Sequence, residues 1–274
     1  MNIAVIQPQG HGSGTTTIAA LLASELGSRN AQVCLAATKP VSDALYQYYN
    51  VQEEKTKQNV GTELVSLIKF GGIKKEKVRD YCRNVEENLD LFVLNTPYQK
   101  GILEEDDMVQ TLEFLGTNSP YDYVVYDVDE KHLERQTVKT ILSVADACIL
   151  VLTQDACDVK SFMKQKQAFI KDTRGIPTVV VVNRYSTLLG DIKGLAQSMG
   201  VKNTKNWCTV HDNIYVRYCG NRGEYPVLSK KIRENAADVV ELNHDVSVIT
   251  QNIMEIKKID RKRRIESQRS ARKQ

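Results

Sequence analysis

Glycines and hydroxyl side chains near the start of the chain have the types and spacing of an anion-binding turn. Gly12 and Gly14 precede three consecutive threonines in the run GHGSGTTT, residues 10–17. Glycine lets the backbone curl so that successive N–H groups point inward and form a nest for an anion. A helix that starts at the threonines adds an N-terminal dipole, which favours negative charge. The candidate phosphate-binding residues are Gly10, His11, Gly12, Ser13, Gly14, Thr15, Thr16 and Thr17.

The lysine that usually accompanies such a turn is absent. A standard nucleotide-binding loop would place lysine at position 15, where this chain has Thr15. Its loss removes a charge-assisted contact to phosphate, about 1.5–3 kcal/mol of binding, but leaves the backbone nest. Phosphoryl transfer suffers more, because it depends on positioned cations as charge spreads at the γ-phosphate. We expect ATP and Mg²⁺ to bind weakly or not at all, without efficient hydrolysis.

Thr16 and Asp127 are the candidate Mg²⁺ ligands if a nucleotide binds. The Thr16 hydroxyl would bind the ion, and the Asp127 carboxylate, which ends the apolar run YDYVVYD, would hold one of its waters. The alternatives are that Thr16 caps the helix N-terminus and that Asp127 is a solvated carboxylate at a strand end. A further alternative is that the glycine turn is retained only for the fold.

These residues have to be positioned by an alternation of strands and helices. Several of the strands are almost wholly apolar, as in a parallel sheet that is covered on both faces. The alternation predicts an α/β fold with a three-layer, doubly wound, mostly parallel sheet, whose ligands lie beyond the carboxyl ends of the strands. The expected strands are 3–6, 33–35, 91–94, 123–126, 148–152 and 178–182, and the expected helices are 18–26, 61–69, 104–115, 137–144, 159–171 and 188–199.

Composition bounds the class of protein. Hydrophobic residues make up 42% of the 274, enough for a substantial core, and no apolar run approaches the roughly 18–20 residues that span a bilayer. Because the N-terminus lacks a secretion signal, we expect a cytoplasmic protein, or one at the inner face of the membrane. Six cysteines without CxxC pairing indicate single thiols in a reducing compartment and no metal centre.

The C-terminal segment differs in charge from the rest. Residues 257–274 contain nine Lys or Arg and two acidic residues, a net charge of +7, which leaves −4 for residues 1–256 because the whole chain carries +3. We expect one domain over residues 1–256 and a basic tail over 257–274. Spaced isoleucines indicate that the last helix extends into the tail. The tail is either a disordered end, or a surface for DNA, an anionic membrane or a protein partner.

The N-terminal strand and turn, with later landmarks in order, resemble the ParA/MinD family of deviant Walker A ATPases, and the TadZ/CpaE-like pilus-localisation branch looks closest. That family's loop reads KGGxGK[ST][ST]. Gly12, Gly14, Thr16 and Thr17 match it, whereas Gly10, His11 and Thr15 replace a lysine, a glycine and the second lysine. The family's DxD-P segment appears as AATKP, with Ala37 and Lys39 in place of aspartates, the latter being the water-activating one.

Two landmarks of the family are intact. Asp127 has the position of its Walker B carboxylate. Asn183 and Arg184, in VVVVNRY, fall where the family contacts the nucleotide base, although they could simply terminate the strand. The tyrosines of DALYQYYN, residues 43–50, lie where the family faces its partner subunit or responds to nucleotide; the alternative is ordinary core aromatics.

The resemblance implies a degenerate, nucleotide-binding homodimer that acts as a positioning or assembly factor. Its system would be secretion, pilus or conjugation machinery, or partitioning, with a protein partner. The alternative is a slow ParA-type partition ATPase that binds DNA through residues 257–274. Replacement of both lysines and of the water-activating aspartate predicts that hydrolysis is not efficient.

Overall fold

A computed structural model of the chain describes residues 1–7, 12–38, 43–51, 60–93, 105–128 and 135–271. Within them, eight strands form one sheet in the order β3-β4-β2-β5-β1-β6-β7-β8. Every neighbouring pair is parallel except β3 and β4. The strands are β1 Asn2–Ile6, β2 Val33–Ala37, β3 Arg83–Glu86, β4 Leu89–Val93, β5 Tyr123–Val128, β6 Ala147–Leu152, β7 Thr178–Tyr185 and β8 Trp207–His211.

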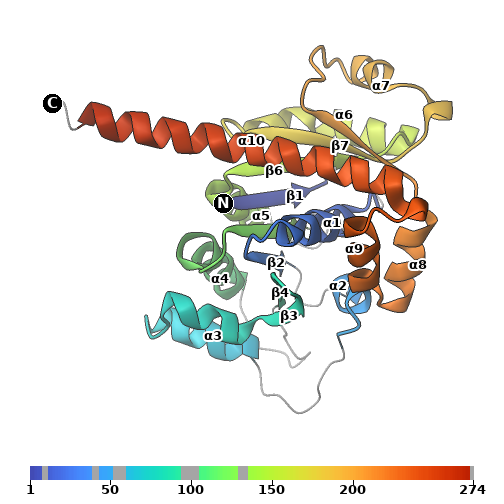
Figure 1. Cartoon of the computed structure of the whole chain (residues 1–274). Helices are drawn as coiled ribbons and strands as arrows, with labels where there is room; N and C mark the ends of the chain where they lie inside the picture. The colour runs from blue at the N-terminus through green and yellow to red at the C-terminus, as the bar shows by residue number, and fades with distance from the viewer. Residues whose placement is uncertain (8–11, 39–42, 52–59, 94–104, 129–134, 272–274) are drawn as a thin grey trace.

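The described helices lie on both faces of the sheet (Figure 1). They are α1 Thr15–Ser28, α2 Asp43–Tyr48, α3 Val60–Lys69, α4 Glu105–Asn118, α5 Arg135–Val144, α6 Ala156–Asp172, α7 Ile192–Ser198, α8 Ile214–Arg222, α9 Tyr225–Arg233 and α10 Val240–Ala271. Short 3-10 helices are η1 Lys75–Tyr81, η2 Thr187–Leu189 and η3 Ala237–Val239.

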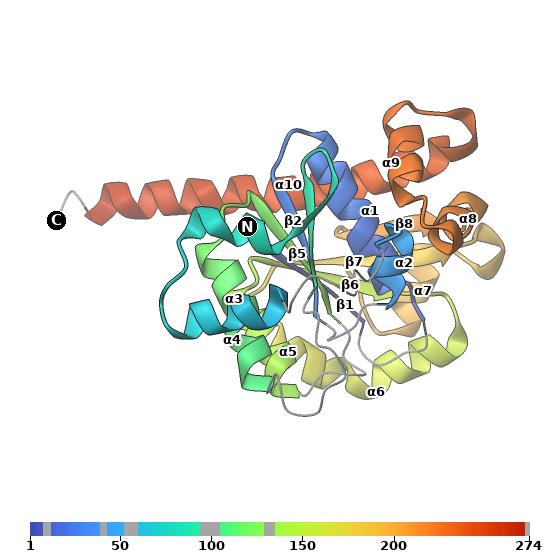
Figure 2. The ribbon, with the colours of Figure 1, turned by 90° about the horizontal axis from the view of Figure 1, so that it is seen from below.

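Two hydrophobic cores cover the sheet, one on each face. One core joins the sheet to α1, α9 and α10, with Leu22, Leu228 and Ile249 among its buried side chains. The other joins it to α3, α4, α5 and α6, with Leu115 and Phe162 among its buried side chains. Figure 2 shows the sheet between these two groups of helices. The predicted three-layer, doubly wound, mostly parallel fold is therefore confirmed.

The structure adds two strands and the helices α8 and α9 to the predicted elements, and it divides one predicted helix. The edge strands β3 and β8 were not predicted, since RNVE is polar and partly exposed and WCTVH is only half buried. The expected helix 188–199 is instead η2 followed by α7. Gly190 adopts φ 109°, which interrupts a helix, and the Asp191 side chain then caps α7 by accepting from the Gly194 N–H at 2.7 Å.

Helix α10 continues through residue 256 without a break, as the isoleucine spacing predicted. Leu242, Val246, Ile249 and Ile253 bury one stripe of it against the sheet. Near the edge of the body, the Lys257 ammonium lies 3.7 Å from the centre of the Tyr123 ring. Further residues extend past the body as helix to residue 271, not as a disordered end (Figure 1). The domain division at residue 256 stays a prediction.

Among the described helices, none has both the length and the apolar character needed to cross a bilayer.

Candidate nucleotide-binding site

The glycine turn (residues 12–17) has the backbone that the sequence predicts. It follows β1, at the carboxyl edge of the sheet between β5 and β6. Gly12 and Gly14 adopt φ 69° and 88°, the left-handed region, and α1 begins directly after Gly14. The Ile18 N–H donates to the Gly14 carbonyl at 3.0 Å, which closes the first helical turn. An anion beyond this helix start would meet free N–H groups and the positive end of the helix dipole.

Ser13 forms hydrogen bonds with two side chains, one directly after β1 and one near the end of β7. The Asn183 amide, at the end of β7, donates to the Ser13 carbonyl at 2.7 Å, and Asn183 is 5% exposed. On the other side, the Ser13 N–H donates to Oε1 of Gln7 at 3.1 Å, and the Ser13 hydroxyl donates to the same oxygen. The turn is thus fixed by side-chain amides as well as by its own glycines. Sequence reasoning did not identify Gln7 as a site residue.

Gly14 also provides space for Asn183. A Cβ at Gly14 would lie 2.3 Å from Nδ2 of Asn183, closer than any real contact. Glycine is therefore needed here twice, for its left-handed backbone and for the approach of the amide. In this arrangement Asn183 supports the turn, a role that neither of the sequence interpretations included.

Thr16 and Asp127 form the predicted hydroxyl and carboxylate pair. The Thr16 hydroxyl donates to Oδ2 of Asp127 at 2.8 Å, across the carboxyl ends of β1 and β5. Asp127 is 5% exposed, and its backbone carbonyl accepts from the Thr38 hydroxyl at 2.7 Å. Both side-chain oxygens are of the hard type that Mg²⁺ prefers, and Mg²⁺ takes one or two such ligands beside phosphate oxygens and water. The pair fits that ion.

A cavity of about 130 Å³ lies at this edge of the sheet beside Thr17. Its lining includes Asn183 and Arg184 near the end of β7, His211 at the end of β8, and Asp212, which follows β8. Two of its polar side chains already have partners: Asp212 accepts from Arg217 at 2.7 Å, and His211 Nδ1 lies 2.9 Å from the buried Asp245. The cavity therefore continues from the glycine turn into a polar pocket.

Arg184 lies in the same cavity and is exposed. It has φ 52° at an irregularity in the pairing of β7 with β8, a conformation that arginine seldom adopts. No carboxylate among the described residues pairs with it. Arg184 is thus an exposed cation in the cavity lining without an acidic partner in the described part of the chain.

Other predicted residues are placed as follows. Gly10, His11 and Lys39 lie outside the described residues, so the phosphate binding predicted for Gly10 and His11 is untested. Ala37 is buried at the end of β2. Of the three tyrosines in residues 43–50, Tyr48 stacks on Tyr225 at 4.3 Å and Tyr49 is 7% exposed. These two pack as core aromatics within the chain.

Most of the cysteine side chains lie inside the protein. All six cysteines are free thiols, four of them buried. Burial raises the pKa of the Cys208 thiol to about 11 and that of Cys34 well above its usual value, so both are uncharged at neutral pH. No group of three or more His, Cys, Asp or Glu side chains with metal-binding geometry occurs among the described residues.

Solved structures with this architecture are numerous, although no protein-family model and no curated protein sequence matches the chain. MinD of Pyrococcus horikoshii, solved with Mg-ADP, superposes with a TM-score of 0.67 at 16% identity, over 92% of this chain and 96% of that one. The chain has the MinD/ParA fold. A ParA-family ATPase of Chlorobium tepidum gives 0.66 at 14% identity, covering 89% and 95%.

A third structure with the MinD/ParA fold is a plasmid partition protein of Borrelia burgdorferi bound to AMPPNP. Its TM-score is 0.61 at 20% identity, over 93% of this chain and 98% of that one. At these identities the likeness concerns the fold. It extends over nearly the full length of each neighbour.

Proposed function

We propose that this chain is a degenerate member of the ParA/MinD family that binds ATP with Mg²⁺ weakly, hydrolyses it slowly and acts as a positioning or assembly factor. The observation that carries the proposal is the glycine turn itself. It has an anion-binding backbone, supported by Asn183 and Gln7, but no lysine at position 15.

The residues that would hold the nucleotide lie at the carboxyl edge of the sheet. The N–H groups of the glycine turn would bind the phosphates, with the dipole of α1 behind them. Thr16 and Asp127 would hold Mg²⁺, which neutralises phosphate charge when bound. The cavity lined by Asn183 and Arg184 would receive the remainder of the nucleotide. Two structures with the same fold were solved with Mg-ADP and AMPPNP, which supports nucleotide binding by this fold.

ATP binding and ATP hydrolysis can be tested separately. We expect the purified chain to bind ATP by calorimetry with an affinity about ten- to hundredfold below that of a loop with lysine, since one charge-assisted contact is missing. We expect phosphate release near background, and faster release by the variant that combines Gly10→Lys with Thr15→Lys. An affinity no better than millimolar would exclude nucleotide binding, and rapid Mg²⁺-dependent release by the unmodified chain would exclude slow hydrolysis.

The cellular role that we propose is localisation, within the TadZ/CpaE-like branch and with a protein partner, in the cytoplasm or at the inner face of the membrane. A MinD with this fold, from Aquifex aeolicus, was solved in complex with MinC, which supports a partner protein. We also propose that ATP stabilises a homodimer. Light scattering coupled to size exclusion, with and without ATP and Mg²⁺, tests it: a mass of about 31 kDa in both conditions contradicts ligand-dependent dimerisation.

The second candidate is a partition ATPase that binds DNA through residues 257–274. The observation in its favour is the continuation of α10 past the body, in a segment of net charge +7 (Figure 1). DNA affinity should then fall steeply with salt, by about 0.9 log unit per phosphate contact for each tenfold rise in salt. Deleting residues 261–274 keeps the Lys257 contact with the body and should abolish this dependence. The same binding assay with anionic vesicles in place of DNA tests whether residues 257–274 bind a membrane surface instead.

A further inference from the structure

The hydroxyl groups of Thr17 and Tyr48 share a hydrogen bond at the inner end of the cavity. Their oxygens lie 3.0 Å apart. Thr17 belongs to the first turn of α1, and Tyr48 is the last residue of α2. Both side chains line the cavity that contains Asn183 and Arg184. A residue distant in sequence from the glycine turn therefore contacts the last threonine of that turn.

Packing fixes the ring of Tyr48. It stacks on Tyr225 with ring centres 4.3 Å apart and planes 7° from parallel. A Cβ at Gly220 would lie 3.0 Å from Cε1 of Tyr48, so the backbone of α8 also limits the ring. Because the ring cannot move freely, its hydroxyl has a defined position beside Thr17.

A second hydroxyl at this place lacks a partner. Tyr225 is fully buried, and its hydroxyl makes no hydrogen bond with the described residues. Burial raises the pKa of Tyr225 well above its usual value, so the phenol stays neutral. Buried polar atoms without partners are rare. The Tyr225 hydroxyl is thus a second polar group near Thr17, and it has no hydrogen-bond partner among the described residues.

We propose that Tyr48 is a positioning residue, which orients the Thr17 hydroxyl for donation to a phosphate oxygen of a bound nucleotide. A pair of hydroxyls has two protons, and their mutual hydrogen bond uses one of them. The remaining proton can donate to an anion in the cavity. This inference rests on the proposed nucleotide binding, and it adds an oriented neutral donor to a turn that lacks a lysine at position 15.

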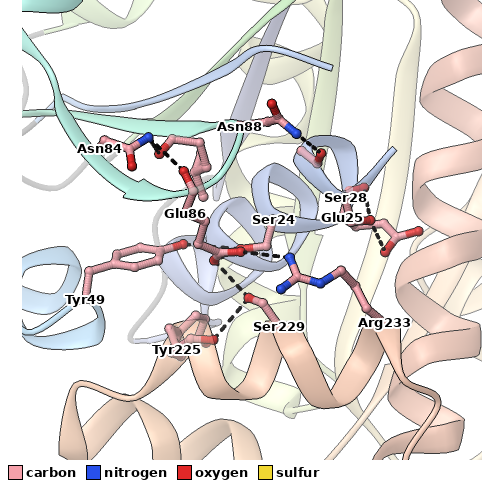
Figure 3. Close-up of polar contacts among 12 residues, drawn as sticks. Ser24, Glu25, Ser28, Tyr49, Asn84, Glu86, Asn88, Tyr225, Ser229 and Arg233 are labelled. Atoms are coloured by element: carbon pink, nitrogen blue, oxygen red, sulfur yellow. Dashed lines mark hydrogen bonds and ion pairs between the residues drawn. The ribbon is translucent and has the colours of Figure 1, made fainter. Parts of the chain in front are cut away.

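The test compares two tyrosines that follow one another in the chain. Tyr48→Phe removes the hydroxyl and keeps the ring that stacks on Tyr225. The matched control is Tyr49→Phe, whose lost hydroxyl lies 3.4 Å from the Ser24 hydroxyl, which in turn donates to the buried Glu86. Figure 3 shows this second group of residues, which line no part of the cavity beside Thr17.

Calorimetry with ATP, ADP and adenosine gives the readout, and urea unfolding checks each fold. We expect Tyr48→Phe to weaken ATP and ADP binding about tenfold, as one oriented hydrogen bond to a charged group predicts. Adenosine affinity should be unchanged, since it has no phosphate. Tyr49→Phe should bind all three ligands like the unmodified chain.

A double-mutant cycle with Thr17→Val separates positioning from direct contact. If Tyr48 acts through Thr17, then Tyr48→Phe should have no further effect on ATP affinity in the Thr17→Val background. Equal ATP affinities for the Tyr48→Phe and Tyr49→Phe variants would overturn the proposal, as would an equal loss for adenosine or additive effects in the cycle. Absence of ATP binding by the unmodified chain would instead refute the proposed function.

Discussion

Gly14 is the position at which the geometry of the glycine turn gives the sharpest stability prediction. In Gly14→Ala, alanine must adopt the left-handed backbone, which costs about 1–2 kcal/mol. Its Cβ would also stand 2.3 Å from Nδ2 of Asn183, so the amide must move and lose its hydrogen bond to the Ser13 carbonyl. Leaving a buried carbonyl without that donor costs about 1–3 kcal/mol. We expect a total loss of about 2–5 kcal/mol in the free energy of unfolding.

Gly12 provides the matched control. It has φ 69°, close to the value at Gly14, but a Cβ there would have no neighbour within 4 Å among the residues that the structure describes. Gly12→Ala should therefore show only the backbone term, about 1–2 kcal/mol. The difference between the two alanine variants isolates the displacement of Asn183.

Urea unfolding followed by circular dichroism measures these free energies. Asn183→Ala alone should cost about 1–3 kcal/mol, because it removes the same hydrogen bond. The double variant with Gly14→Ala should be no less stable than Gly14→Ala alone, since the bond can be lost only once. Equal losses at Gly12 and Gly14, or additivity of the Gly14 and Asn183 variants within about 0.5 kcal/mol, would refute the reasoning.

Three further predictions concern the core and its buried polar groups. Burial raises the pKa of Glu86, so the folded chain binds this proton at a higher pH than the unfolded chain. Acidification from pH 7 toward pH 5 should therefore stabilise the unmodified chain relative to Glu86→Gln. An equal difference in the free energy of unfolding between the two proteins at both pH values, measured by urea unfolding, would contradict this. Thr38→Val should lose about 1 kcal/mol, measured by urea unfolding, because its hydroxyl donates to the buried Asp127 carbonyl, and Thr38→Ser should retain most of it. Ile253→Ala should lose about 2–5 kcal/mol in the same assay, whereas Ile259→Ala, at a position 52% exposed, should change stability by less than about 0.5 kcal/mol.

The central strands were predictable because burial on both faces is visible in the sequence. All residues of β1, β5 and β6 are buried, and each of these strands is an apolar run. The pairing of Thr16 with Asp127 followed as well, since the carboxyl ends of neighbouring parallel strands meet at one edge.

Contacts made by the turn's neighbours could not be predicted. Gln7 lies just before the turn and Asn183 lies far away on β7, and no local pattern marks that their side chains support Ser13. The contact of Tyr48 with Thr17 depends on how α2 packs on α8 and α9, which the spacing of three tyrosines does not determine. Glycine at position 190 was a local signal that should have ended the helix predicted over residues 188–199.

Because α10 is one continuous helix, it determines where the basic C-terminal segment lies relative to the glycine turn. Lys257 leaves the body beside Tyr123, at the amino end of β5, whereas the glycine turn lies at the opposite, carboxyl edge of the sheet. With a rise of 1.5 Å per residue, residues 261–271 reach about 16 Å farther out. A macromolecule bound by residues 261–271 would therefore lie far from the glycine turn, and any coupling between the two would pass through the contacts of α10 with α1, β7 and β8.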